Sequence, residues 1–142
     1  MPRFLVPPNV HKPLSNTSHG VLTASDLKKL AISGQIGMDR NGEVPNDIVA
    51  QIDLAFQNFL AVLANAQLEI GDVVKINAFC TLRGSSRLFR EAQEKYFGKH
   101  APASSYVEVL GLAETRFLIQ IEGEAIREQG FAAPSAAPIP QR

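Results

Sequence analysis

The chain has 142 residues, of which 45% are hydrophobic and 20% charged, and its 14 basic side chains balance 14 acidic ones. This length and composition are typical of one globular domain that buries a core without metal or disulfide support. The zero net charge gives no field that favours nucleic acid. A single cysteine excludes an intrachain disulfide, and no apolar run approaches the length of a membrane span, so we expect a cytoplasmic protein with neither nucleic-acid nor membrane partners.

The first half of the chain predicts a leader, a strand and a long helix. Residues 1–17 contain four prolines among polar residues and are expected to be irregular. The apolar run 30–37 ends on a glycine and predicts a buried strand, and Asn41-Gly42 predicts a tight turn after it. Asp47 is expected to cap a helix that reaches about residue 67, because apolar side chains recur there every three or four positions.

The second half of the chain alternates strands with one more helix. Alternating apolar side chains indicate the strands, while a serine at the start and a glycine at the end bound the helix. The expected elements are a strand at 73–81, a helix from Ser85 or Ser86 to Phe97, and strands at 106–110 and 116–126.

Together these elements predict an α+β domain over residues 18–128, with two helices on one face of a sheet. Two helices shield only one face, so the other face should meet a partner subunit or a solvated interior, and an oligomer is expected. Cys80 falls in an apolar strand and is interpreted as a small buried side chain rather than a catalytic thiol. The Ala- and Pro-rich segment 129–142 is expected to be disordered or to lie over a neighbouring subunit.

Five short motifs stand in order on the expected elements: Ser33-Gly34-Gln35-Ile36, Gly71-Asp72-Val73-Val74-Lys75, Tyr96-Phe97-Gly98, Pro102 to Val109, and Ile121-Glu122. They resemble the RidA/YjgF family of reactive intermediate deaminases, and the resemblance covers roughly residues 18–127. It implies a chorismate-mutase-like fold that forms a homotrimer with small-molecule clefts between subunits. It also implies hydrolysis of enamines and imines such as 2-aminoacrylate, with no metal and no organic cofactor.

The resemblance assigns the cleft residue by residue. Ser33 and Gly34 stand where the family's Ser-Gly lines the cleft. Ser104 stands where the family has the arginine that holds a substrate carboxylate, and Gln120 where it has the glutamate that positions water. Arg90 replaces an asparagine in the second helix.

These differences weaken the family's standard reaction. One hydroxyl hydrogen bond from Ser104 in place of a charge-assisted pair costs about 1.5–3 kcal/mol in binding or transition-state energy. Gln120 cannot act as a general base, because its amide does not titrate. We therefore expect deamination of ordinary 2-imino acids to be weak or absent.

Other side chains could replace the missing groups, and each has a plainer alternative role. Arg90 either restores an anion site from a different wall or is a solvated helix residue. Glu122 lies on the same strand face as Gln120 and is either a displaced base or part of a polar stripe. His19, at the cleft edge where the family has an aromatic motif, is either a proton-transfer group or an exposed loop residue. Tyr106, where a smaller residue is usual, narrows the pocket or donates a hydrogen bond.

Three functions remain open at this point. The first is a hydrolase that deaminates an enamine or imine other than 2-aminoacrylate, with Gln120, Glu122 and His19 as its catalytic candidates. The second is a protein that binds or senses a small molecule without catalysis. The third, an endoribonuclease or translation inhibitor, has the least support, because the chain lacks a basic surface signature.

Overall fold

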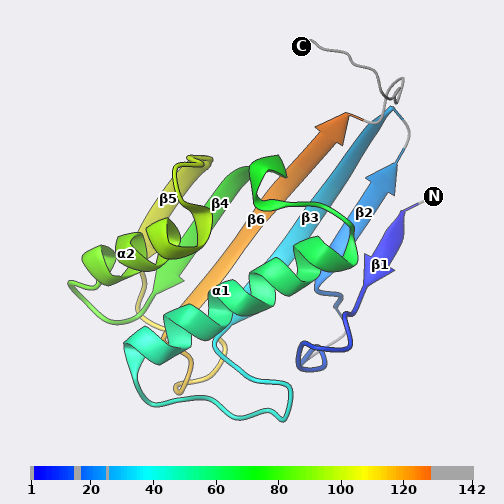
Figure 1. Cartoon of the computed structure of the whole chain (residues 1–142). Helices are drawn as coiled ribbons and strands as arrows, with labels where there is room; N and C mark the ends of the chain where they lie inside the picture. The colour runs from blue at the N-terminus through cyan, green and yellow to red at the C-terminus, as the bar shows by residue number, and fades with distance from the viewer. Residues whose placement is uncertain (1, 15–16, 25, 129–142) are drawn as a thin grey trace.

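The computed structural model describes residues 2–14, 17–24 and 26–128. Its strands and helices form a single layered unit (Figure 1). In chain order the elements are β1 (Arg3–Leu5), β2 (Gly20–Ala24), β3 (Leu27–Ile36), α1 (Ile48–Asn65), the short 3₁₀ helix η1 (Ile70–Asp72), β4 (Val73–Cys80), α2 (Ser86–Phe97), β5 (Ala103–Glu108) and β6 (Ile119–Glu128).

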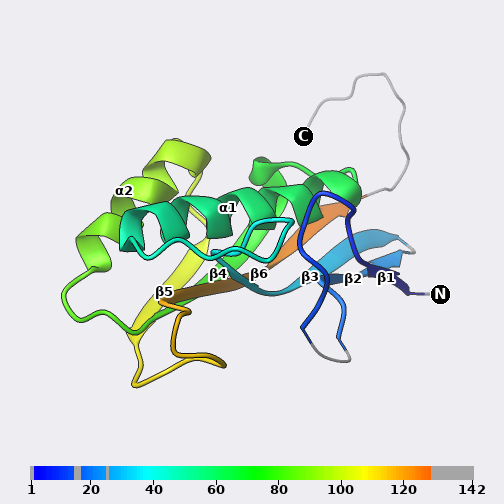
Figure 2. The same ribbon diagram turned by 90° about the horizontal axis from the view of Figure 1, so that it is seen from below.

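The strands form one sheet in the order β1-β2-β3-β6-β4-β5. Neighbouring strands run antiparallel except β4 and β5, which are parallel and are joined by α2 as the crossover that a parallel pair requires. Both helices lie on the same face of the sheet, and no helix of the described residues lies on the other (Figure 2). The predicted α+β fold with two helices on one face is confirmed.

Helix α1 is the central core helix. It begins after Asp47, whose carboxylate accepts a hydrogen bond from the Ala50 backbone N–H at 2.9 Å, as the sequence predicts for this cap. Its apolar stripe is enclosed against the sheet, with Phe56 and Phe59 at 0% exposure. By length and composition α1 could cross a membrane, which corrects the expectation that no segment reaches that length. Because the stripe belongs to the buried core, these features are those of a core helix.

Helix α2 lies beside α1, over β4 and β5, and packs through aromatic rings (Figure 1). The Phe56 ring stacks on the rings of Phe89 and Tyr96, with centroids 5.5 and 5.4 Å apart. The helix ends at Gly98, as predicted, where a φ of +60° falls in the left-handed region that favours glycine.

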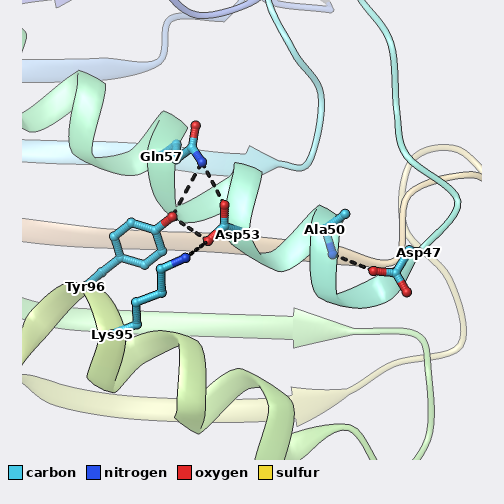
Figure 3. Close-up of polar contacts among 6 residues, drawn as sticks. All are labelled: Asp47, Ala50, Asp53, Gln57, Lys95 and Tyr96. Carbon is cyan, nitrogen blue, oxygen red and sulfur yellow. Dashed lines mark hydrogen bonds and ion pairs between the residues drawn. The ribbon is translucent and has the colours of Figure 1, made fainter.

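A polar cluster of Asp53, Gln57, Lys95 and Tyr96 joins the two helices at their outer surface (Figure 3). The Asp53 carboxylate accepts hydrogen bonds from the Lys95 ammonium at 2.7 Å and from the Tyr96 hydroxyl. The Gln57 amide donates to the same carboxylate at 2.7 Å. The hydrogen bond from Lys95, followed by that from Tyr96, holds the pKa of the Asp53 carboxyl below its ordinary value. This cluster fixes the position of α2, which contributes one wall of the site described below.

Gly123 allows β6 and β4 to approach each other under α1. A Cβ at this position would lie 2.4 Å from the Lys75 carbonyl oxygen and 3.0 Å from the Phe59 ring. The missing side chain thus leaves room for both the neighbouring strand and the core aromatic ring.

The sequence analysis did not predict β1 or β2, the two strands nearest the N-terminus. Residues 3–5 form β1, although the sequence predicts irregular chain there, and β1 pairs antiparallel with β2. A three-residue edge strand gives too short a pattern to stand out, and the prolines that follow Leu5 lie beyond the paired residues. Leu5 is buried, so the leader contributes to the core.

The last two strands are shifted from their predicted bounds. β5 spans Ala103–Glu108 rather than 106–110, and β6 spans Ile119–Glu128 rather than 116–126. The start of β5 is set by its parallel pairing with β4, which begins at Lys75 opposite Ala103 and which local sequence does not encode. The predicted tail 129–142 lies outside the described residues.

The sheet face away from the helices carries a polar stripe. The Lys29 ammonium lies 4.0 Å from the Glu124 carboxylate, and the Asn77 amide donates to Glu122 at 3.3 Å. At the β5 edge this polar surface gives way to an exposed apolar side chain, Val107. These features are compatible with the predicted contact of this face with a further subunit.

Candidate functional site

Most of the residues singled out in the sequence gather in two separate hollows, and Glu122 lies outside both. The first, which we call the edge cavity, measures about 520 Å³ and lies between α2 and the edge strand β5. The second, which we call the bulge pocket, measures about 180 Å³ and lies where β3 and β6 lose their regular register. Residues lining the edge cavity include Phe89, Arg90, Lys99, Pro102, Ser104 and Tyr106, and residues lining the bulge pocket include His11, Ser18, His19, Ser33, Gly34 and Gln120.

The edge cavity is built on β5. Ser104 and Tyr106 pair with Ile76 and Ala78 of β4, two residues whose side chains are buried under the helices. Because side chains alternate along a strand, Ser104 and Tyr106 both point to the helix side of the sheet. Here a serine stands where the resemblance places an arginine, so β5 contributes no cation to this cavity.

Two positively charged side chains, Arg90 and Lys99, line the edge cavity outside β5. Arg90 comes from α2, where its guanidinium lies 3.4 Å from the Ser86 hydroxyl, and Lys99 follows the helix end at Gly98. Glu94 is the carboxylate among the lining residues. The structure therefore places Arg90 in the same cavity as Ser104, as the anion-site hypothesis requires, and adds Lys99, which the sequence reasoning missed. A cation just after a predicted helix stop was the available signal.

Tyr106 is held by a buried chain of hydrogen bonds. Its hydroxyl lies 2.8 Å from the Ser85 hydroxyl, and Ser85 in turn donates to the Leu82 carbonyl oxygen at 2.6 Å. The Cys80 thiol lies 3.0 Å from the Ser85 oxygen. Burial raises the pKa of the Tyr106 phenol above its ordinary value, against a smaller lowering by the hydrogen bond with Ser85. Cys80 is fully buried, in line with its interpretation as a packed strand residue.

The bulge pocket is organised by Gly34 and Gln120. The register of β3 against β6 shifts between Ile32 and Gln35, which places Gly34 in a β-bulge. A Cβ on Gly34 would lie 2.4 Å from the Gln120 amide nitrogen, so the Gln120 side chain lies directly against the glycine backbone. The structure brings Gln120 together with Ser33 and Gly34, three of the residues that the resemblance assigns to the cleft.

Ser33 can only accept a hydrogen bond from a ligand. Its hydroxyl donates to the Ser18 carbonyl oxygen, and its backbone N–H donates to the His19 carbonyl oxygen at 2.7 Å. Both of its protons are thus used inside the protein. The lone pairs of the hydroxyl oxygen remain for a ligand.

His19 is buried rather than exposed, and both of its ring nitrogens are engaged. Nε2 lies 2.8 Å from the His11 carbonyl oxygen, which can only accept, so Nε2 carries the proton. Nδ1 then accepts a hydrogen bond from the Gln35 amide at 3.1 Å. Burial lowers the pKa of His19. This arrangement favours a structural role in the pocket wall over the proton-transfer role predicted from its residue type.

His11 lies in the same wall, in a segment where the sequence reasoning expected only irregular leader. The residue is 5% exposed, and its ring stands edge-on to that of His19, with centroids 5.0 Å apart. Nδ1 donates to the Lys12 carbonyl oxygen at 2.8 Å, which leaves Nε2 buried without a hydrogen-bond partner. The leader segment thus closes one side of the bulge pocket.

Glu122 does not join either hollow. It faces the uncovered side of the sheet, where it accepts a hydrogen bond from Asn77, and lines a third hollow of about 340 Å³ with Lys75 and Glu124. Of the two alternatives open for Glu122, this placement favours the polar stripe over the displaced base.

Asn58 positions the bulge pocket and was missed by the sequence reasoning. It is buried on α1, and its amide donates to the carbonyl oxygens of Ile36 and Met38, both at 2.9 Å. These bonds hold the end of β3 just beyond the bulge. An amide within an apolar helix stripe was the signal that could have revealed it.

The two hollows lie on different sides of one chain. Gln120 alternates with Ile119 and Ile121, which are buried under the helices, so its side chain points to the uncovered face. Ser104 points to the helix side at the sheet edge, and β4 lies between their strands. A single chain therefore keeps two groups of the predicted cleft residues apart. Among the described residues, no group of three or more His, Cys, Asp or Glu side chains is placed to hold a metal ion.

The fold and these two hollows define an α+β domain with small-molecule pockets. The family model described as Endoribonuclease L-PSP matches residues 12–127. The chain belongs to this family, whose members include the reactive intermediate deaminases of the Rid type.

The similar proteins carry deaminase and Rid-type names. A 2-iminobutanoate/2-iminopropanoate deaminase of Escherichia coli strain K12 is 36% identical over 107 residues, which make up 72% of this chain and 83% of the relative. A RutC family protein of Pyrococcus horikoshii is 32% identical over 122 residues, covering 84% and 94% of the two chains. The crystal structure of Escherichia coli TdcF with bound serine matches with a TM-score of 0.80 at 25% identity, covering 89% of this chain and 99% of that one.

Proposed function

We propose that this chain is a Rid-type hydrolase that deaminates an imine or enamine other than 2-aminoacrylate, in a cleft completed by a second copy within a homotrimer. The observation that carries the proposal is the division of the cleft residues, with Gln120 and Gly34 in the bulge pocket and Ser104 in the edge cavity. A ligand that touches both walls needs two chains, because one chain directs them to opposite sides of its sheet. The deaminase name of the Escherichia coli relative supports the reaction class.

The proposed reaction is hydrolysis of a carbon–nitrogen double bond. Water adds to the imine carbon, the resulting carbinolamine loses ammonia, and a carbonyl compound remains. The Gln120 carbonyl oxygen can accept one hydrogen of the attacking water and so orient its lone pair. Gln120 takes up no proton, so the proton passes to the leaving nitrogen or to solvent, and we expect a smaller rate enhancement than a carboxylate base would give.

The proposed anion site lies on the helix side of the edge cavity. Arg90 and Lys99 line it, whereas Ser104 on the strand offers one hydroxyl. A carboxylate held by Arg90 would stand in a different place from one held by a residue on β5. The cavity of about 520 Å³ is also larger than a three-carbon imino acid fills. Both features support a substrate that is longer than 2-aminoacrylate or that carries its anionic group elsewhere.

Ammonia release from imines generated in situ tests this proposal. The panel would contain 2-iminopropanoate, longer 2-imino acids and imines whose carboxylate is farther from the nitrogen, with the Escherichia coli deaminase assayed beside this protein. We expect low activity on 2-iminopropanoate and higher activity on a longer member of the panel. Arg90→Ala should reduce the higher activity, while Arg87→Ala, one turn removed on the same helix, serves as the matched control. No ammonia release above the background from any member would overturn the proposal.

A non-catalytic binding protein is the second candidate. The observation in its favour is the chemistry of the bulge pocket, where Gln120 does not titrate and both nitrogens of His19 are engaged. Thermal shifts with serine, the ligand of the Escherichia coli TdcF structure, and with stable analogues of the imines would test it. Stabilisation by a ligand without turnover of any imine would favour this second function.

Both candidates are proposed to act in the cytoplasm on a small molecule, without a metal or an organic cofactor. The endoribonuclease description of the family model is the least supported function for this chain, because its zero net charge gives no basic surface for RNA.

A further inference from the structure

Tyr106 has its hydroxyl proton committed inside the protein. Ser85 has one hydroxyl proton, and it goes to the Leu82 carbonyl oxygen, which can only accept, at 2.6 Å. The Cys80 thiol also points to that carbonyl oxygen, but at 3.7 Å, so the much shorter contact commits the Ser85 proton there. Across the contact of 2.8 Å between the Ser85 and Tyr106 oxygens, this assigns Tyr106 as the donor. The Cys80 thiol lies 3.0 Å from the same serine oxygen as well as near the Leu82 carbonyl oxygen, so it closes the buried side of this group. The Tyr106 oxygen is left with lone pairs only.

Packing around Ser85 and Tyr106 keeps this donor and acceptor arrangement in place. Ser85 is 2% exposed, and Cys80 is fully buried, so water does not compete for their hydrogen bonds. The Tyr106 ring lies against the Phe89 ring at a centroid distance of 5.5 Å. Both rings line the edge cavity, so the acceptor oxygen is attached to a fixed wall of that cavity.

Charge in the edge cavity complements this acceptor. Arg90 and Lys99 favour an anionic group, whereas an acceptor-only oxygen disfavours a carboxylate at its own end of the cavity. Glu94 lines the cavity as well and reinforces the demand for a donor rather than a second anion. The planar faces of Phe89 and Tyr106 suit an unsaturated or aromatic body between the two ends.

We infer that the edge cavity selects organic anions that carry an N–H donor on a planar body, with Tyr106 as the residue that recognises the donor. The anionic group binds Arg90 and Lys99, and the Tyr106 oxygen accepts the hydrogen bond from nitrogen. This inference rests on the proposed function only in taking that nitrogen to be the one released as ammonia; the binding preference stands on the cavity alone. It reverses the donor role that the sequence suggested for Tyr106.

Binding of substituted benzoates to the full chain tests the inference. The 2-, 3- and 4-aminobenzoates are compared by calorimetry with the methylbenzoates of the same substitution, which match them in shape but lack the donor. At least one aminobenzoate should bind about three- to tenfold more tightly than its methyl counterpart, the range of one net hydrogen bond. Tyr106→Phe should remove this difference. The matched control is Tyr96→Phe, which alters the other tyrosine of the chain, outside the cavity, and should retain it.

Ser85→Ala provides an independent variant, since Ser85 makes no side-chain cap to α2. It frees the Tyr106 proton, so the preference should turn from aminobenzoates to formylbenzoates, whose carbonyl oxygen accepts. Equal binding of amino and methyl probes, no binding of any probe, or a preference that survives Tyr106→Phe would overturn the inference. A protein that prefers the amino probes but releases no ammonia from imines would instead refute the proposed hydrolase and leave this inference standing.

Discussion

Single residues set the charge and shape of the proposed cleft. Ser104 removes a cation from β5, and Arg90 and Lys99 supply positive charge from α2 and the segment after it. Gly34 has no side chain, which lets Gln120 lie against the backbone at the bulge. The position of a bound anion in the edge cavity thus depends on which element carries the positive side chains, as well as on how many there are.

An arginine introduced on β5 should increase the deamination of ordinary 2-imino acids. Ser104→Arg places a guanidinium on the cavity wall where the resemblance expects one, and the cavity of about 520 Å³ has room for it. A charge-assisted pair gained there is worth about 1.5–3 kcal/mol, so we expect kcat/KM for 2-iminopropanoate to rise about tenfold to a hundredfold. The measurement is ammonia release under identical conditions for the two proteins. Ser105→Arg, on the opposite strand face, is the control, and an equal rise in that variant would refute the positional argument.

Elements of the fold hold these residues at fixed places. The parallel pairing of β4 with β5 points Ser104 and Tyr106 toward α2, and the Asp53 cluster fixes α2 against α1 (Figure 3). The leader contributes at this scale too, because His11 closes the bulge pocket beside His19. The sequence predicts both helices and the strands they cover, since long periodic stretches and caps are local signals. It does not predict β1, whose three residues acquire strand geometry only from pairing with β2.

Removing the Asp53 carboxylate should loosen the contact between the helices. Asp53→Ala is expected to lower the free energy of unfolding by about 1 kcal/mol at pH 7, because one partly exposed carboxylate with several donors is lost. Urea denaturation of the variant and the parent protein measures the difference. In the double variant with Lys95→Ala, the two losses should be less than additive, because the residues are in contact.

The same cluster has a defined dependence on pH. Hydrogen bonds lower the pKa of the folded Asp53 carboxyl below the ordinary value of 3.8, so its contribution is fully present above that value. The contribution is lost as pH falls through the lowered pKa of the folded state. The stability difference between parent and Asp53→Ala should therefore shrink below about pH 4, and a difference that grows on acidification would contradict this assignment.

At the scale of the whole molecule, the uncovered sheet face and the divided cleft both point to assembly. Val107 and Leu110 are apolar side chains with 45% and 106% exposure near the β5 edge, where contact with a further chain would bury them. The number of copies in the proposed trimer comes from the family resemblance. A second copy would bring the bulge pocket of one chain to the edge cavity of the next.

Mixing two inactive variants should test this division. Gly34→Leu displaces Gln120 and blocks the bulge pocket, while Ser104→Trp fills the edge cavity. If each cleft takes one wall from each of two chains, co-expression of both variants recreates about a quarter of the clefts with two intact walls. We expect activity on the best imine to return to about that fraction, in particles of three times the 15.4 kDa chain mass by light scattering. Loss of activity in both variants without recovery on mixing would place the whole site in one chain.

The sequence by itself determined the family, the two helices, the Asp47 cap and the helix end at Gly98, because motifs and periodicity are encoded in short stretches of chain. It could not tell that Ser104 and Gln120 face opposite sides of the sheet, since this depends on strand order and on a bulge, which are set by pairing between distant segments. It also could not tell that His19 has both ring nitrogens engaged or that the Tyr106 hydroxyl is hydrogen-bonded to Ser85. Which group donates and which accepts is decided only when residues far apart in the sequence pack together, because a hydrogen that is bonded to one acceptor is not available to another.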